Sequence, residues 1–117
     1  MTVLRVLPHI AEAIEHNAPV VALETSVLSQ GLPVPHNADA ARLMVAAVEH
    51  CGAIAALTGV AAGIPTLGLT ADELTRFLSR HGVRKVSARD IAACVAQGAR
   101  HRCRRLRTLR YRPHARA

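Results

Sequence analysis

The chain has 117 residues, half of them apolar, and a formal net charge of +7. This length suits one small domain or part of a larger one, and no apolar run approaches the roughly 18 residues that span a bilayer. The basic charge is concentrated at one end, because residues 100–117 carry eight arginines and no acid, whereas residues 1–99 carry seven basic and eight acidic residues. We therefore expect a nearly neutral domain and an arginine-rich tail.

The first predicted elements alternate between strand and helix. Residues 2–7 predict a short strand, and residues 8–18 predict a helix with Pro8 in its first turn, where a missing N–H costs little. The segment at 19–24 is apolar until it reaches Glu24. Such a run is typical of a strand covered on both faces, as in a parallel sheet.

Residues 37–52 show the clearest helical pattern of the chain. Asn37 is placed to cap the start of this helix and Gly52 to stop it. The apolar residues expected on one face are Ala40, Leu43, Met44, Ala47, Val48 and Cys51. Their spacing predicts a single stripe that packs on the sheet.

Two strands are predicted next, at 53–60 and 64–69, joined around Gly63. Thr70 and Glu73 form a T-x-x-E capping box, which predicts the start of a third helix. We expect this helix to run to about residue 80, just before a glycine that suits its end.

Residues 83–87 predict a last strand, after which Ser87 and Asp90 can cap a helix that ends near residue 98. The resulting order β-α-β-α-β-β-α-β-α favours a layered α/β fold. In such folds ligands bind outside the carboxyl ends of the strands.

Glu24 is the first candidate for a chemical role, because it lies where a predicted central strand ends. Partial burial there would raise the pKa of a carboxyl group, since desolvation penalises the charged form, and a raised pKa suits a general acid. The alternative is a glutamate that only caps or forms an ion pair at the rim of the sheet.

Lys85 is the second candidate, as the only lysine and near the end of another short strand. At the same edge of the sheet it could bind a phosphate or form a Schiff base. With Arg84, Arg89 and Ser87 nearby, the next helix N-terminus would suit an anion. The alternatives are an ordinary surface lysine, and a Ser87–Asp90 pair that only caps the helix.

Cysteine, histidine and glycine patterns add no further site. Cys51, Cys94 and Cys103 are odd in number and lack CxxC spacing, so we expect reduced, core-filling thiols in a cytoplasmic protein. The seven histidines show no HxH or HExxH spacing, and we expect no metal site from them. Gly59 and Gly63 fit turns, because no GxGxxG or Walker pattern surrounds them.

Two separated blocks of the sequence resemble one enzyme family. "PVVALETSVLSQGLPVPHN" is similar to the N-terminal signature of pseudouridine-5′-phosphate glycosidases, which include indigoidine biosynthesis protein A. "VRKVSARDIA" is similar to the K-V-S-x-R-D block of that family, and "GAIAALTGVAAGIPTLGLTADEL" follows its middle part. The resemblance covers about residues 7–99 without large gaps.

The resemblance implies an α/β/α sandwich, of which this chain has the N-terminal part, and a homotrimer. It implies reversible cleavage of the C–C glycosidic bond of pseudouridine 5′-phosphate to uracil and ribose 5-phosphate, with a divalent metal that is usually manganese. By the motif match, Glu24 would be the proton donor and Lys85 would contact the phosphate of the substrate.

The chain also departs from this family. The usual E-S-T is E-T-S here, which keeps both hydroxyl groups. The metal-binding aspartate and the lysine nucleophile of the family have no counterpart, because Lys85 is the only lysine and no acid follows Asp90. We therefore nominate no metal ligand and expect no turnover by the isolated chain.

The last segment differs most. We expect residues 1–99 to form the domain and residues 100–117 to be a disordered tail. An acid-free, arginine-rich run is typical of a shifted frame through GC-rich DNA, so our hypothesis for its origin is a frameshift. The DNA downstream of codon 99, translated in all frames, tests it.

Two alternative functions do not involve catalysis. The tail could bind nucleic acid through its arginines, although one tyrosine and no recognisable reader motif favour only non-specific binding. The domain could also be a small interaction module, because missing neighbouring strands would leave sheet edges uncovered.

Overall fold

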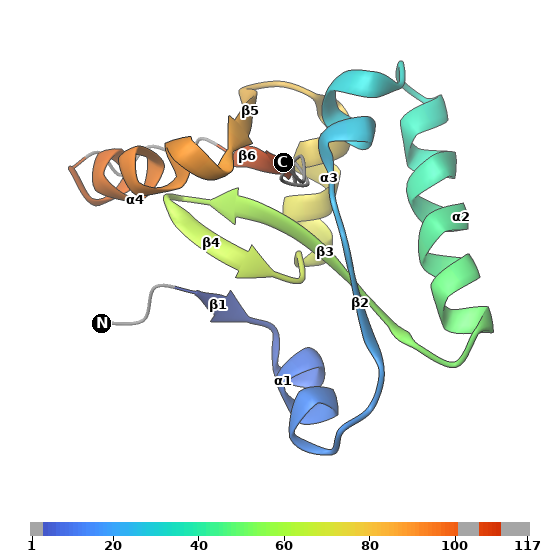
Figure 1. The fold of residues 1–117 in the computed structure, drawn as a ribbon. Coiled ribbons are helices and arrows are strands. Elements are labelled where there is room, and N and C mark those ends of the chain that lie inside the picture. The colour runs from blue at the N-terminus through green and yellow to red at the C-terminus, as the bar shows by residue number, and fades with distance from the viewer. Residues whose placement is uncertain (1–3, 101–105, 111–117) are drawn as a thin grey trace, which may run out of the picture.

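The computed structural model describes residues 4–100 and 106–110 and shows helices arranged around a mixed sheet (Figure 1). The elements are β1 (Arg5–Val6), α1 (Pro8–Glu15), β2 (Val20–Leu23), η1 (Val27–Gly31), α2 (His36–His50), β3 (Ile54–Ala61), β4 (Ile64–Leu67), α3 (Ala71–Ser79), β5 (Val83–Ser87), η2 (Ala88–Asp90), α4 (Ile91–Arg100) and β6 (Leu106–Arg110). Of the two short helices, η1 is a π-helix and η2 is a 3₁₀-helix. The predicted α/β class is confirmed.

Strand β3 organises the sheet, because it pairs with three other strands. Its first half pairs in parallel with β2, and its second half pairs antiparallel with β4. Strand β6 pairs antiparallel with β3 and parallel with β5, while β1 pairs parallel with β4. The sheet therefore combines parallel and antiparallel neighbours.

The core consists of three small clusters on the two faces of β3. Leu57 and Ala61 point to one face of this strand and Val60 to the other, because side chains alternate along a strand. The clusters are Leu28–Ala41–Leu57, Ala61–Phe77 and Val60–Val86–Cys94. Helices α2 and α3 therefore cover one face, and α4 covers the other.

Strand β2 is less buried than its apolar sequence predicts. Val21 is 40% exposed and Ala22 is exposed as well. Within the described residues β2 pairs only with β3, so its second edge has no strand beside it. The prediction of a strand covered on both faces is wrong for this structure, because the consecutive residues Val21 and Ala22 point to opposite faces and both are exposed.

Helix α2 forms where predicted, but its start and its packed face differ. Pro35 occupies the N-cap position, and Asn37 is buried within the first turn, so the prediction of Asn37 as the cap is wrong. Leu43 is 58% exposed and Cys51 is exposed, while Ala41 is buried against the sheet. The predicted stripe is confirmed for Ala40 and Met44, which pack against the core cluster, so the packed face is only partly shifted. Small alanines occupy several sides of this helix and mark no unique face.

Most of the other local signals are confirmed. The Thr70–Glu73 capping box opens α3, and Pro8 lies in the first turn of α1. Cys94 fills the core as expected, whereas the same expectation is wrong for Cys51; Cys103 lies outside the described residues.

Gly68 shows why a glycine is needed after β4. Its φ angle is +96°, and a Cβ atom there would lie 2.6 Å from Cδ1 of Ile10 and 2.8 Å from Cγ of Leu7. The backbone thus passes directly against the start of α1, which only a residue without a side chain permits.

The C-terminal segment contains a strand. Residues 106–110 form β6, between β3 and β5, so the expectation of disorder is not met at these five positions. The pattern was missed because this pairing joins residues far apart in the sequence, and the arginine-rich composition gave no strand signal.

Candidate active site

Glu24 directly follows β2, at the position that the sequence predicts. Its side chain is exposed, so the partial burial that we expected is not found. The buried Ser26 donates a hydrogen bond from Oγ to Oε1 of Glu24 over 2.7 Å. The carboxylate is therefore open to solvent but held on one side by a fixed hydroxyl.

Two hydroxyl groups form hydrogen bonds between β3 and the end of β2, which Glu24 follows. The fully buried Thr25 donates from Oγ1 to the carbonyl oxygen of Thr58 over 2.7 Å. In return, Thr58 donates from Oγ1 to the carbonyl oxygen of Leu23 over 3.0 Å. Strands β2 and β3 are thus tied together at the point where the backbone of Glu24 leaves the sheet.

The π-helix η1 begins immediately after these residues. The amides of Leu28 and Ser29 both donate to the carbonyl oxygen of Thr25 over 3.1 Å, and the amide of Leu32 donates to that of Val27 over 2.9 Å. Short π-helical turns are rare and are often found at functional sites. The backbone next to Glu24 is therefore part of the η1 hydrogen-bond pattern.

Asn37 and Arg80 support this region and were not predicted to do so. The buried Asn37 side chain donates to the carbonyl oxygens of Leu28 and Leu78, over 3.0 and 2.7 Å. Arg80 donates to backbone carbonyl oxygens in and beside η1. Such residues carry little sequence signal, because their partners are backbone atoms.

Lys85 is the third of the five residues of β5, so it lies mid-strand rather than at its end. It is exposed, whereas the next residue, Val86, is buried on the other side of the strand. Because β5 is parallel to β6 and β6 is antiparallel to β3, β5 runs opposite to β2. The expectation of a shared carboxyl edge for Lys85 and Glu24 is therefore wrong.

The sheet register nevertheless aligns Lys85 and Glu24 with neighbouring residues of β3. Lys85 pairs with Thr108, which pairs with Gly59. Gly59 follows Thr58, the residue whose carbonyl accepts the Thr25 hydroxyl next to Glu24. Strand β6 is thus the element that connects the lysine to this part of the sheet.

The helix start after β5 is already occupied by a carboxylate. The amide and Oγ of Ser87 both donate to Oδ2 of Asp90, over 3.1 and 2.7 Å. Arg84 and Arg89 are exposed. This geometry favours the capping alternative for Ser87 and Asp90, because an incoming anion would meet the Asp90 carboxylate there.

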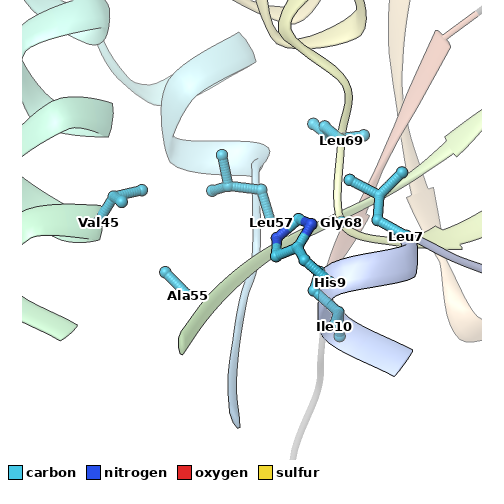
Figure 2. A pocket seen from close by; sticks show the side chains of 8 residues that line it. All are labelled: Leu7, His9, Ile10, Val45, Ala55, Leu57, Gly68 and Leu69. Atoms are coloured by element: carbon cyan, nitrogen blue, oxygen red, sulfur yellow. The ribbon is translucent and has the colours of Figure 1, made fainter. Parts of the chain in front are cut away.

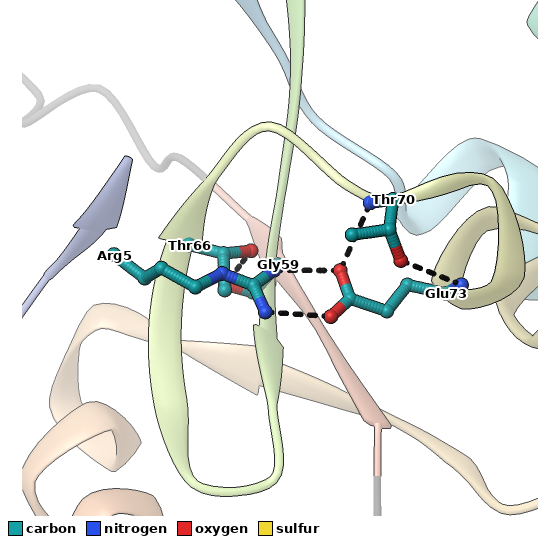
Figure 3. A network of polar contacts seen from close by, with 5 residues as sticks. All are labelled: Arg5, Gly59, Thr66, Thr70 and Glu73. Carbon is teal, nitrogen blue, oxygen red and sulfur yellow. Dashed lines mark hydrogen bonds and ion pairs between the residues drawn. The ribbon is translucent and has the colours of Figure 1, made fainter. Parts of the chain in front are cut away.

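A separate polar network joins β1 to α3 (Figure 3). Arg5 donates from both terminal nitrogens to the two carboxylate oxygens of Glu73, over 2.7 and 2.6 Å. The hydrogen bonds from Arg5 lower the pKa of Glu73, a shift that burial opposes and the Thr70 amide reinforces. The same pairing raises the pKa of Arg5. The network contains neither Glu24 nor Lys85.

Neither Glu24 nor Lys85 lines the cavity shown in Figure 2. Its volume is about 60 Å³, and it lies between α1, α2 and β3. Val45, Leu57 and Leu69 contribute apolar walls, and His9 is its only ionisable side chain. A space of this size and chemistry does not suit a sugar phosphate, so we do not place the active site there.

Two negative findings apply to the described parts of the chain. No group of three or more His, Cys, Asp or Glu side chains within residues 4–100 and 106–110 could hold a metal ion. The residues present therefore do not fit the manganese that the resemblance implies, and we derive no step through it. None of the helices in these ranges has the length and apolar character needed to cross a bilayer.

The chain is similar in sequence to curated proteins of several bacteria, which bear one common name. The chain is 56% identical over 88 residues to a pseudouridine-5′-phosphate glycosidase of Gemmatimonas aurantiaca, covering 75% of this chain and 29% of that protein. It is 43% identical over 95 residues to the enzyme of the same name in Dickeya dadantii, covering 81% and 30%. It thus spans about a third of the length of these relatives.

Two solved structures are also similar to this chain, in fold and in sequence. The prealnumycin C-glycosynthase AlnA, in complex with ribulose 5-phosphate, matches with a TM-score of 0.77 and 34% identity over 94% of this chain and 33% of that one. An indigoidine synthase A-like protein from Thermotoga maritima matches with a TM-score of 0.71 and 26% identity over 92% and 32%.

The family model described as "Indigoidine synthase A like protein" matches residues 9–103. The chain belongs to this family.

Proposed function

We propose that this chain supplies the proton-donor part of a pseudouridine-5′-phosphate glycosidase. The observation that carries the proposal is the placement of Glu24, exposed at the end of β2 and oriented by Ser26, in a chain whose curated relatives bear that name. The sugar phosphate in the related C-glycosynthase supports a sugar-phosphate substrate.

Cleavage of the C–C glycosidic bond returns an electron pair to a carbon of the uracil ring, and that carbon must gain a proton. Glu24 is proposed to donate this proton and to assist opening of the ribose ring. Ser26 holds one carboxylate oxygen, so the other oxygen remains available to the substrate. Lys85 is proposed to neutralise the phosphate group as a point charge.

Other components of the reaction are proposed to come from outside this sequence. Schiff-base chemistry requires a second amine, and Lys85 is the only lysine. We propose the same for the manganese ligand, since the described residues contain no cluster for it. We also propose a homotrimeric, cytoplasmic enzyme, and we expect the isolated chain to bind substrate without turnover.

The test is an NMR titration of the 117-residue chain with pseudouridine 5′-phosphate, alongside an assay for released uracil. We expect chemical shift changes at Glu24 and at Lys85, weaker binding in Lys85→Gln, and no uracil. Arg84→Gln is the matched control, because Arg84 is an exposed cation on the same strand. Equal weakening by both substitutions would contradict a specific role for Lys85, and shift changes elsewhere would contradict the site.

A further inference from the structure

The C-terminal end of α3 is capped by side chains from η1 and from the first turn of α2. The last carbonyl groups of a helix lack partners within the helix. Here Ser29 donates from Oγ to the carbonyl oxygen of Phe77 over 3.2 Å, and Asn37 donates to that of Leu78 over 2.7 Å. The segment that follows Glu24 therefore satisfies the end of a helix almost fifty residues later in the sequence.

Arg80, at the C-cap of α3, binds η1 in return. Its Nε donates to the carbonyl oxygen of Ser29 over 2.8 Å, while its two terminal nitrogens donate to Leu32 and Gln30 over 3.0 and 3.1 Å. One planar guanidinium thus contacts three backbone carbonyls of a single turn. A lysine ammonium cannot reproduce this arrangement, because its donors radiate from one atom.

The backbone of Arg80 is unusual for an arginine. Its φ angle is +64°, in the left-handed region. Helices often end in this conformation, but the residue there is usually glycine, sometimes asparagine. A strained residue is a reason to look for a function of its side chain, and the three hydrogen bonds to η1 are the contacts that a glycine would lack.

The contacts of Arg80 lead back to the candidate acid. The first two amides of η1 after Val27 donate to the carbonyl oxygen of Thr25, and Ser26 is the N-cap of η1. Ser26 in turn holds Glu24. A change in the position of η1 therefore moves the hydroxyl that orients the carboxylate.

We propose that Arg80 is a positioning residue, which fixes η1 and through Ser26 sets the orientation of the Glu24 carboxylate. The inference rests on the proposed function only in taking Glu24 as the acid. The hydrogen-bond path from Arg80 to Glu24 is a property of this chain that can be measured without turnover.

The experiment uses Arg80→Gly and Arg80→Asn in the full chain, since both replacements favour the left-handed conformation and keep the end of α3. Amide hydrogen exchange is followed at Leu28, Ser29 and Leu32. We expect exchange there to accelerate about tenfold or more, with little change in β3. Arg76→Gln is the control, because Arg76 is an exposed cation on the same helix.

A second measurement distinguishes a role of Arg80 in orienting Glu24 from a role in stabilising η1 alone. We expect Arg80→Asn to shift the carboxyl ¹³C resonance of Glu24 in the same direction as Ser26→Ala does. In a Ser26→Ala background, Arg80→Asn should have no further effect on this resonance, because both substitutions break one path. Arg80→Lys retains the charge and should not restore the wild-type signal.

Three results would overturn the proposal. They are unchanged exchange in η1, an unchanged Glu24 resonance despite a mobile η1, and equal loss of protection throughout the chain in both Arg80 variants. Failure of the chain to bind pseudouridine 5′-phosphate would instead refute the proposed function, and it would leave these measurements valid.

Discussion

Ser26 and Glu24 form a hydrogen bond of 2.7 Å in which the donor is buried and the acceptor is exposed. A buried hydroxyl has few rotamers available, so it acts as a rigid reference for a carboxylate that could otherwise adopt many orientations. The sequence places these residues two positions apart, and the turn after β2 brings their side chains together.

Removal of this hydroxyl should free Glu24 without unfolding the protein. We expect Ser26→Ala to lower the free energy of unfolding by no more than about 1 kcal/mol, because water can replace the lost donor at an exposed carboxylate. ¹³C relaxation should show greater mobility of the Glu24 side chain. An equally rigid Glu24 in the variant would contradict the orienting role, and Ser79→Ala, which alters another hydroxyl, serves as the control.

At Gly68, the cost of a steric clash can be measured separately from the cost of a positive φ angle. Both Gly68 and Gly52 have positive φ angles, but a Cβ at Gly52 would meet no atom within 4 Å. We expect Gly52→Ala to cost about 1–2 kcal/mol of stability from strain alone. Gly68→Ala adds a clash with Ile10 and Leu7, which should cost about 1–3 kcal/mol more. Urea unfolding of both variants measures the difference in the free energy of unfolding. Equal losses would show that α1 moves away from the added Cβ atom at no cost.

The Arg5–Glu73 pair should make stability depend on acid pH. The pKa of Glu73 is lowered from its ordinary value of 4.5 in the folded protein, chiefly by hydrogen bonds from Arg5. Its contribution is therefore present above pH 4.5 and is lost as the pH falls through the lower, folded-state pKa. Partial exposure of the pair limits the effect to about 1 kcal/mol.

The matched variant is Glu73→Gln, which keeps a side chain able to accept from the Thr70 amide. Thermal unfolding measured between about pH 7 and pH 3 should show wild type and variant converging at the acid end. A stability difference that is the same at every pH would indicate lost packing rather than lost charge.

Strand β5 should depend on the C-terminal segment. Within the described residues its only strand neighbour is β6, so a chain that stops after Arg100 should lose amide protection in β5 while the β2–β3 pair stays protected. Thr108→Pro, which keeps the charge of the tail, should reproduce the loss by removing a backbone donor. Protection of β5 in both variants would show that α4 alone holds this strand.

Local signals in the sequence were sufficient for most elements. Three of these signals act over only a few residues: the capping box at Thr70, the proline at the start of α1 and the apolar run before Glu24. Each can therefore be recognised in a short segment of sequence. The position of Glu24 directly after β2 was predicted correctly, because a polar residue that ends an apolar strand is itself a local pattern.

The remaining features depend on contacts between distant segments. The pairing of β6, the direction of β5 and the exposure of β2 follow from which strands lie side by side. Asn37 and Arg80 bind carbonyl oxygens, which every residue possesses, so neither partner is marked in the sequence. Burial of Glu24 was overestimated for the same reason, since it depends on neighbours that the local sequence does not specify.

The position of β6 also affects the order in which the domain can assemble during synthesis. Strand β2 can pair with β3 as soon as both have left the ribosome, but β5 has to wait for residues 106–110. At about 5–20 residues per second, this delay is on the order of one to a few seconds. During that time the edge of β5 is open to other chains, so a newly made molecule is more exposed to misassociation than a finished one.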